Sequence, residues 1–259
     1  MLLLTVHIGL AQSSPGTACG EKAASDHLYS IRPDIKARIK QEEALLAAGK
    51  KQRNGLLSRG MQVNEVVTLS VVVHIIHNNG PENISDAAVL RGIEHLNQGF
   101  SAAPPYAGKG VNTQIRFCLA ERTPDGQPTN GITRNQSYNT VMGGYDYYAD
   151  DQVVKDINRW NPNCYVNIWL VNSIPGNVVG YAYLPGAAGT DKDGIIMEAA
   201  YFGNTAANDV VVIHEMGTIL GCTILSKAPV KMMTAYSMAT RFAIRRPTSR
   251  RHLCPVITT

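Results

Sequence analysis

The last 42 residues of the chain lack acidic side chains altogether. Residues 218–259 contain seven lysines and arginines, whereas residues 1–217 carry the remaining 17 basic and all 20 acidic residues. The formal net charge of +4 therefore comes from this tail. Such asymmetry is typical of a segment that binds nucleic acid or membranes, or of one whose composition was never selected. Almost no aromatic residues lie among the basic ones, so we do not predict a nucleic-acid partner.

Long apolar runs and closely spaced cysteines are also missing. Beyond the N-terminus no segment reaches the roughly 18 uninterrupted apolar residues of a membrane-spanning helix, so we predict no membrane partner. Scattered cysteines exclude a dense disulfide framework and a close metal-binding pair; they are Cys19, Cys118, Cys164, Cys222 and Cys254. Cys118 and Cys164 lie on predicted strands, where we expect buried apolar residues rather than a bridge.

The N-terminal residues have the features of a secretory signal peptide. Residues 1–10 are nearly all apolar, and Gly9-Leu10-Ala11 resembles a small-residue cleavage site. We therefore predict a signal peptide over residues 1–11 and a secreted protein; the alternative is a disordered N-terminus. The usual basic residues before the apolar run are absent, which favours a start further upstream. Residues 20–60 are polar, with one helix predicted from Asp34 to Ala48 and a basic loop after it.

From residue 66 onward the chain has the patterns of a globular core. An apolar fraction of 44% with 17% charged residues suits one sizeable domain. Strands are predicted at residues 66–76, 115–119, 165–171, 180–184 and 194–197. Helices are predicted after Ser85, at residues 150–160 and around His214. Asn204 or Thr205 would cap the helix that carries His214. Residues 123–145 have the composition of turns. This order predicts an α/β (α+β) fold with a mixed sheet.

Residues 210–217 contain half of a zinc-binding helix motif, His214-Glu215. Two histidines four residues apart on a helix can reach one metal ion, and a glutamate after the first can accept a proton from the metal-bound water. The complete motif needs histidines at positions that hold Thr218 and Ile224. Taken alone, the pair is weak support for zinc, and a helix-surface pair is the alternative. The run Val210–Ile213 would by itself be assigned to a strand.

Seven short segments precede this motif in a specific order. They are Val71-Val72-Val73-His74-Ile75-Ile76-His77-Asn78, Asn83-Ile84-Ser85-Asp86, Ile115-Arg116-Phe117-Cys118-Leu119-Ala120, Gly131-Ile132-Thr133-Arg134, Val166-Asn167-Ile168-Trp169-Leu170, Gly180-Tyr181-Ala182-Tyr183-Leu184-Pro185-Gly186 and Asp193-Gly194-Ile195-Ile196. With His214-Glu215-Met216-Gly217 they resemble the catalytic domain of the pappalysin family of metzincin zinc endopeptidases, in its secreted cytophagalysin-like branch. The resemblance covers residues 66–217 and stops at Gly217.

The resemblance implies a twisted mixed sheet with a backing helix and an active-site helix. It implies Zn²⁺ as cofactor, His214 as first zinc ligand, Glu215 as general base, and a protein or peptide as substrate. An antiparallel edge strand would bind the substrate in extended form through Gly180, Tyr181, Ala182 and Tyr183. Cys19 is similar to the zymogen switch of secreted relatives, whose thiolate occupies the zinc until activation; an ordinary free cysteine is the alternative. Whether structural Ca²⁺ is bound stays open.

The family pattern can be recovered after Gly217 in a neighbouring reading frame. If the codons from Gly217 to Lys227 are started one base earlier, the permitted codons can spell the family segment, including both missing histidines. We therefore hypothesise a one-base shift after Gly217, which makes residues 218–259 a divergent basic tail. The predicted organisation is a signal peptide over residues 1–11, a pro-segment over 12–60 and a metzincin-like N-terminal catalytic subdomain over 61–217. The chain as written would then be inactive; a catalytically dead peptide-binding domain is the alternative.

Two further histidines, His74 and His77, are expected to be packing or surface residues rather than ligands. Asn83-Ile84-Ser85 and Asn135-Gln136-Ser137 are glycosylation sequons, which have meaning only in a host that uses them.

Overall fold

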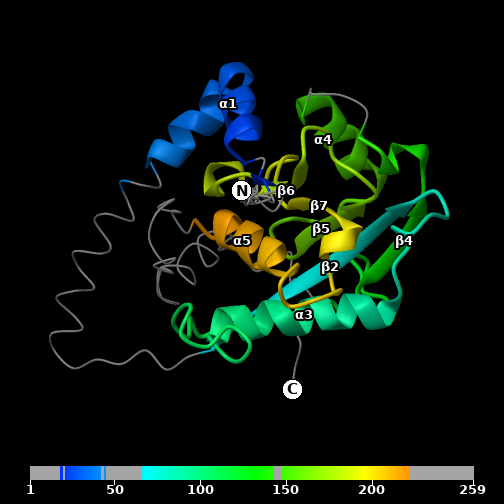
Figure 1. Cartoon of the computed structure of the whole chain (residues 1–259). Coiled ribbons are helices and arrows are strands. Elements are labelled where there is room, and N and C mark those ends of the chain that lie inside the picture. Colours follow the sequence, from blue (N-terminus) through cyan, green and yellow to red (C-terminus); the bar gives the residue numbers. More distant parts are fainter. Residues whose placement is uncertain (1–17, 20, 42–43, 45–65, 143–146, 222–259) are drawn as a thin grey trace, which may run out of the picture.

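The computed structural model describes residues 18–19, 21–41, 44, 66–142 and 147–221 (Figure 1). Its strands are β1 (Ala18–Cys19), β2 (Val67–His77), β3 (Ile115–Leu119), β4 (Ile132–Gln136), β5 (Val166–Val171), β6 (Val178–Ala182) and β7 (Ile195–Glu198). Its helices are α1 (Glu21–Ile31), α3 (Asp86–Ser101), α4 (Tyr147–Ile157) and α5 (Val210–Ile219), and residues 33–41 are also helical. Three single turns of 3₁₀ helix join them, η1 (Tyr138–Thr140), η2 (Pro185–Ala187) and η3 (Ala199–Tyr201).

One mostly parallel sheet runs through the domain in the order β1-β6-β7-β5-β2-β3, and β4 pairs with β2. β2 is long enough to pair with β3 along its first half and with β4 along its second half. Within this sheet β6 and β7 form the antiparallel pair, and the other pairs are parallel. From Val71 to His77 every residue of β2 is buried, as expected of a parallel strand that is covered on both faces. The mixed α/β fold is therefore confirmed.

Helices cover the sheet on both faces (Figure 1). On one face α3 and α5 enclose a first core; among its buried side chains are Val71, Ile75, Ile168, Leu170, Phe100 and Met216. On the other face α1, residues 33–41 and α4 enclose a second core; among its buried side chains are Leu28, Ile35, Val154, Trp169, Tyr181, Tyr183, Ala187 and Ile196. Adjacent strand residues such as Ile168 and Trp169 thus belong to opposite cores, because side chains alternate along a strand.

Local signals in the sequence are confirmed where they are strong. The Ser85 hydroxyl accepts a hydrogen bond from the amide of Ala88 at 3.3 Å, and α3 begins at the next residue, Asp86. Each predicted strand lies within two residues of an observed one, and these are β2, β3, β5, β6 and β7. The helix predicted to follow Pro33 is present in its described part, residues 33–41. These elements depend on caps and apolar periodicity, which a short window of sequence contains.

Three local expectations are wrong. Residues 132–136 are not turn but strand β4, which exists because it pairs with β2. Neither Asn204 nor Thr205 caps α5, since the helix begins at Val210 and Asp209 is the N-cap residue. Cys164 takes part in a disulfide bond, whereas Cys118 is a free thiol.

The helix predicted around His214 is confirmed as α5. The run Val210–Ile213, which by itself would be assigned to a strand, is helical, and Val211, Val212 and Ile213 pack in the first core.

Candidate functional site

Helix α5 places His214 and Glu215 at the predicted site. Val211, Val212, Met216 and Ile219 pack into the first core and fix the rotation of the helix about its axis. The His214 side chain is left about one-third exposed, at 32%, while Glu215 is buried, and His214 Nε2 lies 3.9 Å from Glu215 Oε1. Burial lowers the pKa of His214, so the imidazole is neutral near pH 7, the form that can bind a metal ion.

Thr218 stands one helical turn after His214, where the motif requires the second histidine. Its hydroxyl donates to the backbone carbonyl oxygen of His214 at 3.3 Å, and the side chain is buried. The hydroxyl is therefore directed at the helix backbone instead of a metal position. Ile224, at the third ligand position, lies outside the described residues.

The donor atoms at this site do not fit a catalytic zinc ion. Such a site needs three protein ligands of nitrogen, oxygen or sulfur, and α5 supplies His214 alone from the motif. In the part of the chain that the structure describes, no group of three or more His, Cys, Asp or Glu side chains could hold a metal ion. The roles expected of His214 and Glu215 stay predictions.

A buried carboxylate fixes the start of α5. Asp209 accepts hydrogen bonds from the amide of Gly203 at 2.7 Å and from His95 Nδ1 at 2.5 Å. Its side chain is fully buried, and burial raises the pKa of Asp209 although the contact with His95 opposes this shift. Since His95 belongs to α3, the pair ties the backing helix to the active-site helix. The sequence carries no signal for this pair, because its members are 114 positions apart.

Two further contacts hold the loop between Gly203 and Asp209 onto α3 and the segment after it. Arg91 Nε donates to the carbonyl oxygen of Gly203 at 3.0 Å, and the Tyr106 hydroxyl donates to that of Ala206 at 2.6 Å. The orientation of α5 therefore depends on a rigid loop as well as on its own apolar face.

Strand β6 carries most of the predicted substrate strand. Gly180, Tyr181 and Ala182 lie in β6, and Tyr183 follows it. A side chain at Gly180 would meet Cβ of Met197 and Cγ1 of Val211, both at 3.1 Å, so this glycine lets α5 pack directly against the strand. The side chains of Tyr181 and Tyr183 are buried in the second core. Any recognition by β6 must therefore use its backbone.

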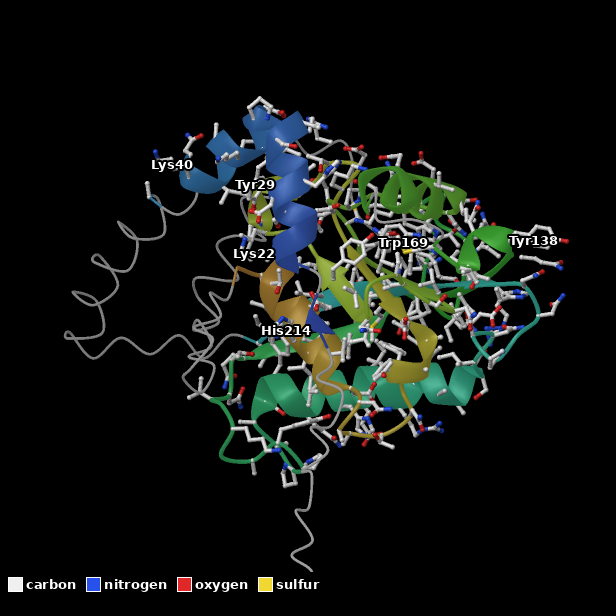
Figure 2. All side chains as sticks on the ribbon, turned by 45° about the horizontal axis from the view of Figure 1, so that its top comes forward. Lys22, Tyr29, Lys40, Tyr138, Trp169 and His214 are labelled. Atoms are coloured by element: carbon white, nitrogen blue, oxygen red, sulfur yellow. The ribbon has the colours of Figure 1, made fainter. Side chains whose placement is uncertain are left out.

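The expectation that β6 forms the edge of the sheet is wrong for this chain. β1 pairs with it in parallel, with Ala18 opposite Val178 and Cys19 opposite Gly180. Because β6 also contacts α5, residues 18–19 pair with the strand against which the helix of His214 packs. In Figure 2 the short blue arrow of β1 appears beside the labelled His214 and the orange ribbon of α5.

His74 is a packing residue, as predicted. Its Nδ1 lies 2.8 Å from the Thr133 hydroxyl, its Nε2 lies 3.0 Å from Oδ1 of Asn167, and its ring stacks 5.3 Å from that of Trp169. Burial lowers the pKa of His74 to about 4, so it is neutral near pH 7. His77 is also buried, and its Nδ1 accepts a hydrogen bond from the amide of Asn79 at 3.3 Å.

Solved structures with the same fold are metalloproteases. The mature mirolysin of Tannerella forsythia, in complex with a cleaved peptide, superposes with a TM-score of 0.52 at 30% identity, covering 61% of this chain and 64% of that one. Mirolysin in complex with compound 9 gives 0.51 at 31% identity over 61% of this chain and 64% of that one. A promirolysin mutant from Tannerella forsythia gives 0.58 at 27% identity, over 78% of this chain and 68% of that one. No protein-family model and no curated protein matches the chain.

These likenesses give the chain the fold of a metzincin-like catalytic domain, of metalloendopeptidase type. The chain spans about 64% of the two mirolysin structures that hold compound 9 and a cleaved peptide. Metalloproteases of this type use a metal ion, typically zinc, and one solved neighbour holds a cleaved peptide. The membership of the pappalysin family, expected from the sequence, is a finer statement that stays a prediction.

Proposed function

We propose that the gene encodes a secreted zinc endopeptidase of the pappalysin family, and that the chain as written is its inactive form. The observation that carries this proposal is the metalloprotease fold, in which α5 presents His214 and Glu215 but carries Thr218 in place of the second ligand. In the restored frame His214 would be the first zinc ligand and Glu215 the general base. The chain as written lacks the donors for zinc, so no catalytic step is assigned to it.

The nucleotide sequence of codons 217–248 tests the frame hypothesis directly. If the offset codons spell histidine at both ligand positions, a gene corrected by one base should give a protein with one zinc ion per chain and peptidase activity. In that protein Glu215→Gln should abolish cleavage while leaving the zinc content unchanged. Offset codons that cannot encode the histidines would refute the shift.

For the chain as written we propose peptide binding as the second candidate function. The specific observation that favours it is the pairing of β1 with β6, in which an extended segment of the chain itself lies along the strand. An added peptide would pair with β6 in place of β1. Purified protein should contain no stoichiometric zinc by mass spectrometry and should leave peptide substrates intact. Stoichiometric zinc together with Glu215-dependent cleavage would overturn the proposed inactivity.

The zymogen prediction has a structural basis in the same strand pair. Residues 18–19 pair with β6, the strand with which a substrate would pair, and Cys19 lies opposite Gly180. We propose that residues 12–60 are a pro-segment that blocks β6 and that Cys19 is its switch residue. In the frame-corrected protein, Cys19→Ser should speed the onset of peptidase activity, whereas an unchanged lag would speak against the switch. A signal peptide over residues 1–11 would direct the protein out of the cell.

A further inference from the structure

The described N-terminal residues form part of the hydrophobic core of the domain. On α1, Ala24 and Leu28 are buried, and on the following helix Ile35 is buried. All three belong to the second core, where they join Trp169 and Tyr181 of the sheet. The sheet is thus covered on this face by a segment that is separated from β2 in sequence by residues 42–65.

The fit is close at one backbone position. A side chain on Gly186 would lie 1.9 Å from Cγ1 of Ile39 and 2.9 Å from the carbonyl oxygen of Ile35. The turn η2 therefore presents a bare backbone surface on which residues 33–41 rest. Arg38 Nη2 donates to the carbonyl oxygen of Ala188 at 3.1 Å, one residue after η2.

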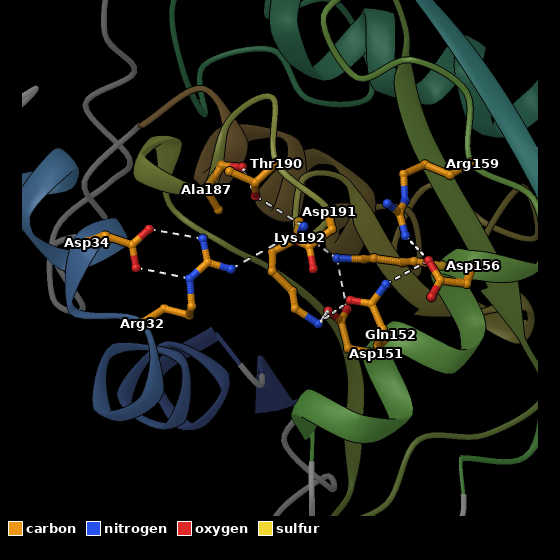
Figure 3. A network of polar contacts seen from close by, with 11 residues as sticks. Arg32, Asp34, Asp151, Gln152, Asp156, Arg159, Ala187, Thr190, Asp191 and Lys192 are labelled. Atoms are coloured by element: carbon orange, nitrogen blue, oxygen red, sulfur yellow. Dashed lines mark hydrogen bonds and ion pairs between the residues drawn. The ribbon is translucent and has the colours of Figure 1, made fainter.

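A polar contact links the same segment to the loop that follows η2. Arg32 donates through Nε and Nη2 to both carboxylate oxygens of Asp34, at 3.0 and 2.9 Å, and its Nη1 lies 3.8 Å from Asp191 (Figure 3). The next residue, Lys192, is fully buried and reaches Oδ2 of Asp151 at 3.2 Å. The docked segment thus sits directly over the buried charges of α4.

We propose that residues 18–41, the docked segment, stay bound to the domain after the chain is cut between residue 44 and β2. This binding requires no metal ion. The apolar contacts of Leu28 and Ile35, the seat at Gly186 and the pairing of β1 with β6 hold it there. None of these contacts includes His214 or requires Cys19 to bind a metal. The inference rests on the proposed function only for the expectation that a protease processes this linker.

The test uses the full chain with the recognition sequence of a site-specific protease inserted after residue 50. After folding, cleavage and transfer to buffer containing EDTA, the N-terminal fragment should co-elute with the remainder of the protein in size-exclusion chromatography. Separation of the two fragments would overturn the proposal. Zinc content and peptidase activity play no part in this readout, so failure of the proposed function leaves it unaffected.

Matched variants identify the contacts that carry the binding. Leu28→Asp and Ile35→Asp should release the fragment after cleavage, whereas Ser30→Asp and Lys36→Asp, at exposed positions of the same helices, should not. Cys19→Ser should keep the fragment bound; its release would show that the cysteine, and not the apolar face, holds the segment. If the aspartate variants do not fold, Leu28→Ala should still speed dissociation by about tenfold or more. A dissociation rate unchanged by Leu28→Ala would contradict the proposal.

Discussion

The Thr218 hydroxyl donates a hydrogen bond to the carbonyl oxygen of His214, 3.3 Å away. The side chain one turn after the first predicted ligand is therefore satisfied within the helix, and the apolar side chains of α5 pack into the first core. This relationship separates the fold of the domain from its chemistry: the helix that should hold zinc forms and packs although the ligand set is incomplete.

Restoring one histidine should restore a partial metal site. In the Thr218→His variant, two imidazoles would lie one turn apart on α5, as a two-point metal site requires. We expect Zn²⁺ or Ni²⁺ at about 100 times the dissociation constant to raise the free energy of unfolding by roughly 2.7 kcal/mol. Urea denaturation with and without metal measures this. The double variant His214→Ala, Thr218→His is the control and should show no metal-dependent gain; an equal gain would place the site elsewhere.

Gly203 should tolerate no side chain. Its φ is +67°, and a Cβ would lie 1.8 Å from the carbonyl oxygen of Ala88. We expect Gly203→Ala to cost about 2–4 kcal/mol of unfolding free energy, from strain and overpacking together. Gly126 has a similar positive φ of +87° with nothing within 4 Å, so Gly126→Ala should cost only about 1 kcal/mol. Equal losses in thermal or urea denaturation would refute the role of the Ala88 contact.

Asp151 should stabilise the folded protein by pairing with two buried lysine side chains. Its carboxylate lies 2.8 Å from Nζ of Lys155 and 3.2 Å from Nζ of Lys192, and all three side chains are fully buried. Burial lowers the pKa of Lys155, and Asp151 opposes that shift. Asp151→Asn should therefore remove the buried negative charge that contacts both ammonium groups and cost about 3–5 kcal/mol in urea denaturation.

The matched control for Asp151 lies on the same helix. Asp156 pairs with Arg159 at the surface, with its side chain 54% exposed. Asp156→Asn should change the free energy of unfolding by no more than about 0.5 kcal/mol. A large loss for this variant would mean that α4 is sensitive to any lost carboxylate, and the special role of Asp151 would not hold.

His74 should make stability depend on pH in a defined window. Its pKa is lowered from 6.5 to about 4 in the folded protein, chiefly by burial. Above pH 6.5 the His74 side chain is neutral in both the folded and the unfolded protein. Between pH 6.5 and about 4 it binds a proton in the unfolded protein only. The stability contributed by the neutral ring is thus complete above pH 6.5 and falls by about 3 kcal/mol as the pH drops to 4.

Urea denaturation between pH 7.5 and 4.5 measures this loss. His74→Gln, which cannot titrate, should reduce the slope in that interval. His214, whose pKa burial also lowers, contributes a slope of the same sign that this variant retains. Burial of the Glu82 carboxylate opposes a lowered pKa, but backbone hydrogen bonds from Asn78 and Gly80 lower it overall. Glu82 therefore changes the stability only below its ordinary pKa of 4.5. The two contributions therefore separate along the pH axis. A His74→Gln variant with an unchanged slope would assign the titration to another group.

A short window of the sequence contains the signals for several elements of the fold. The cap at Ser85, the apolar face of α3 and the buried run of β2 all follow from local periodicity, and the structure confirms each of them. Strand β4 was missed because its residues are half exposed and carry no alternation; they become a strand by pairing with β2. The helix at Val210–Ile213 was ambiguous because β-branched residues favour strands unless packing requires otherwise.

By itself, the sequence determined that the metal-binding motif is incomplete, since the residue types at 218 and 224 do not depend on any fold. It also predicted the order of most helices and strands from residue 66 onward, and with it an α/β fold with a mixed sheet. Only the tertiary structure decided that β1 covers β6, that residues 21–41 complete the second core, and that His95 holds Asp209 at the start of α5. These contacts join segments far apart in the chain. They arise from burial of complementary surfaces, which local periodicity does not encode.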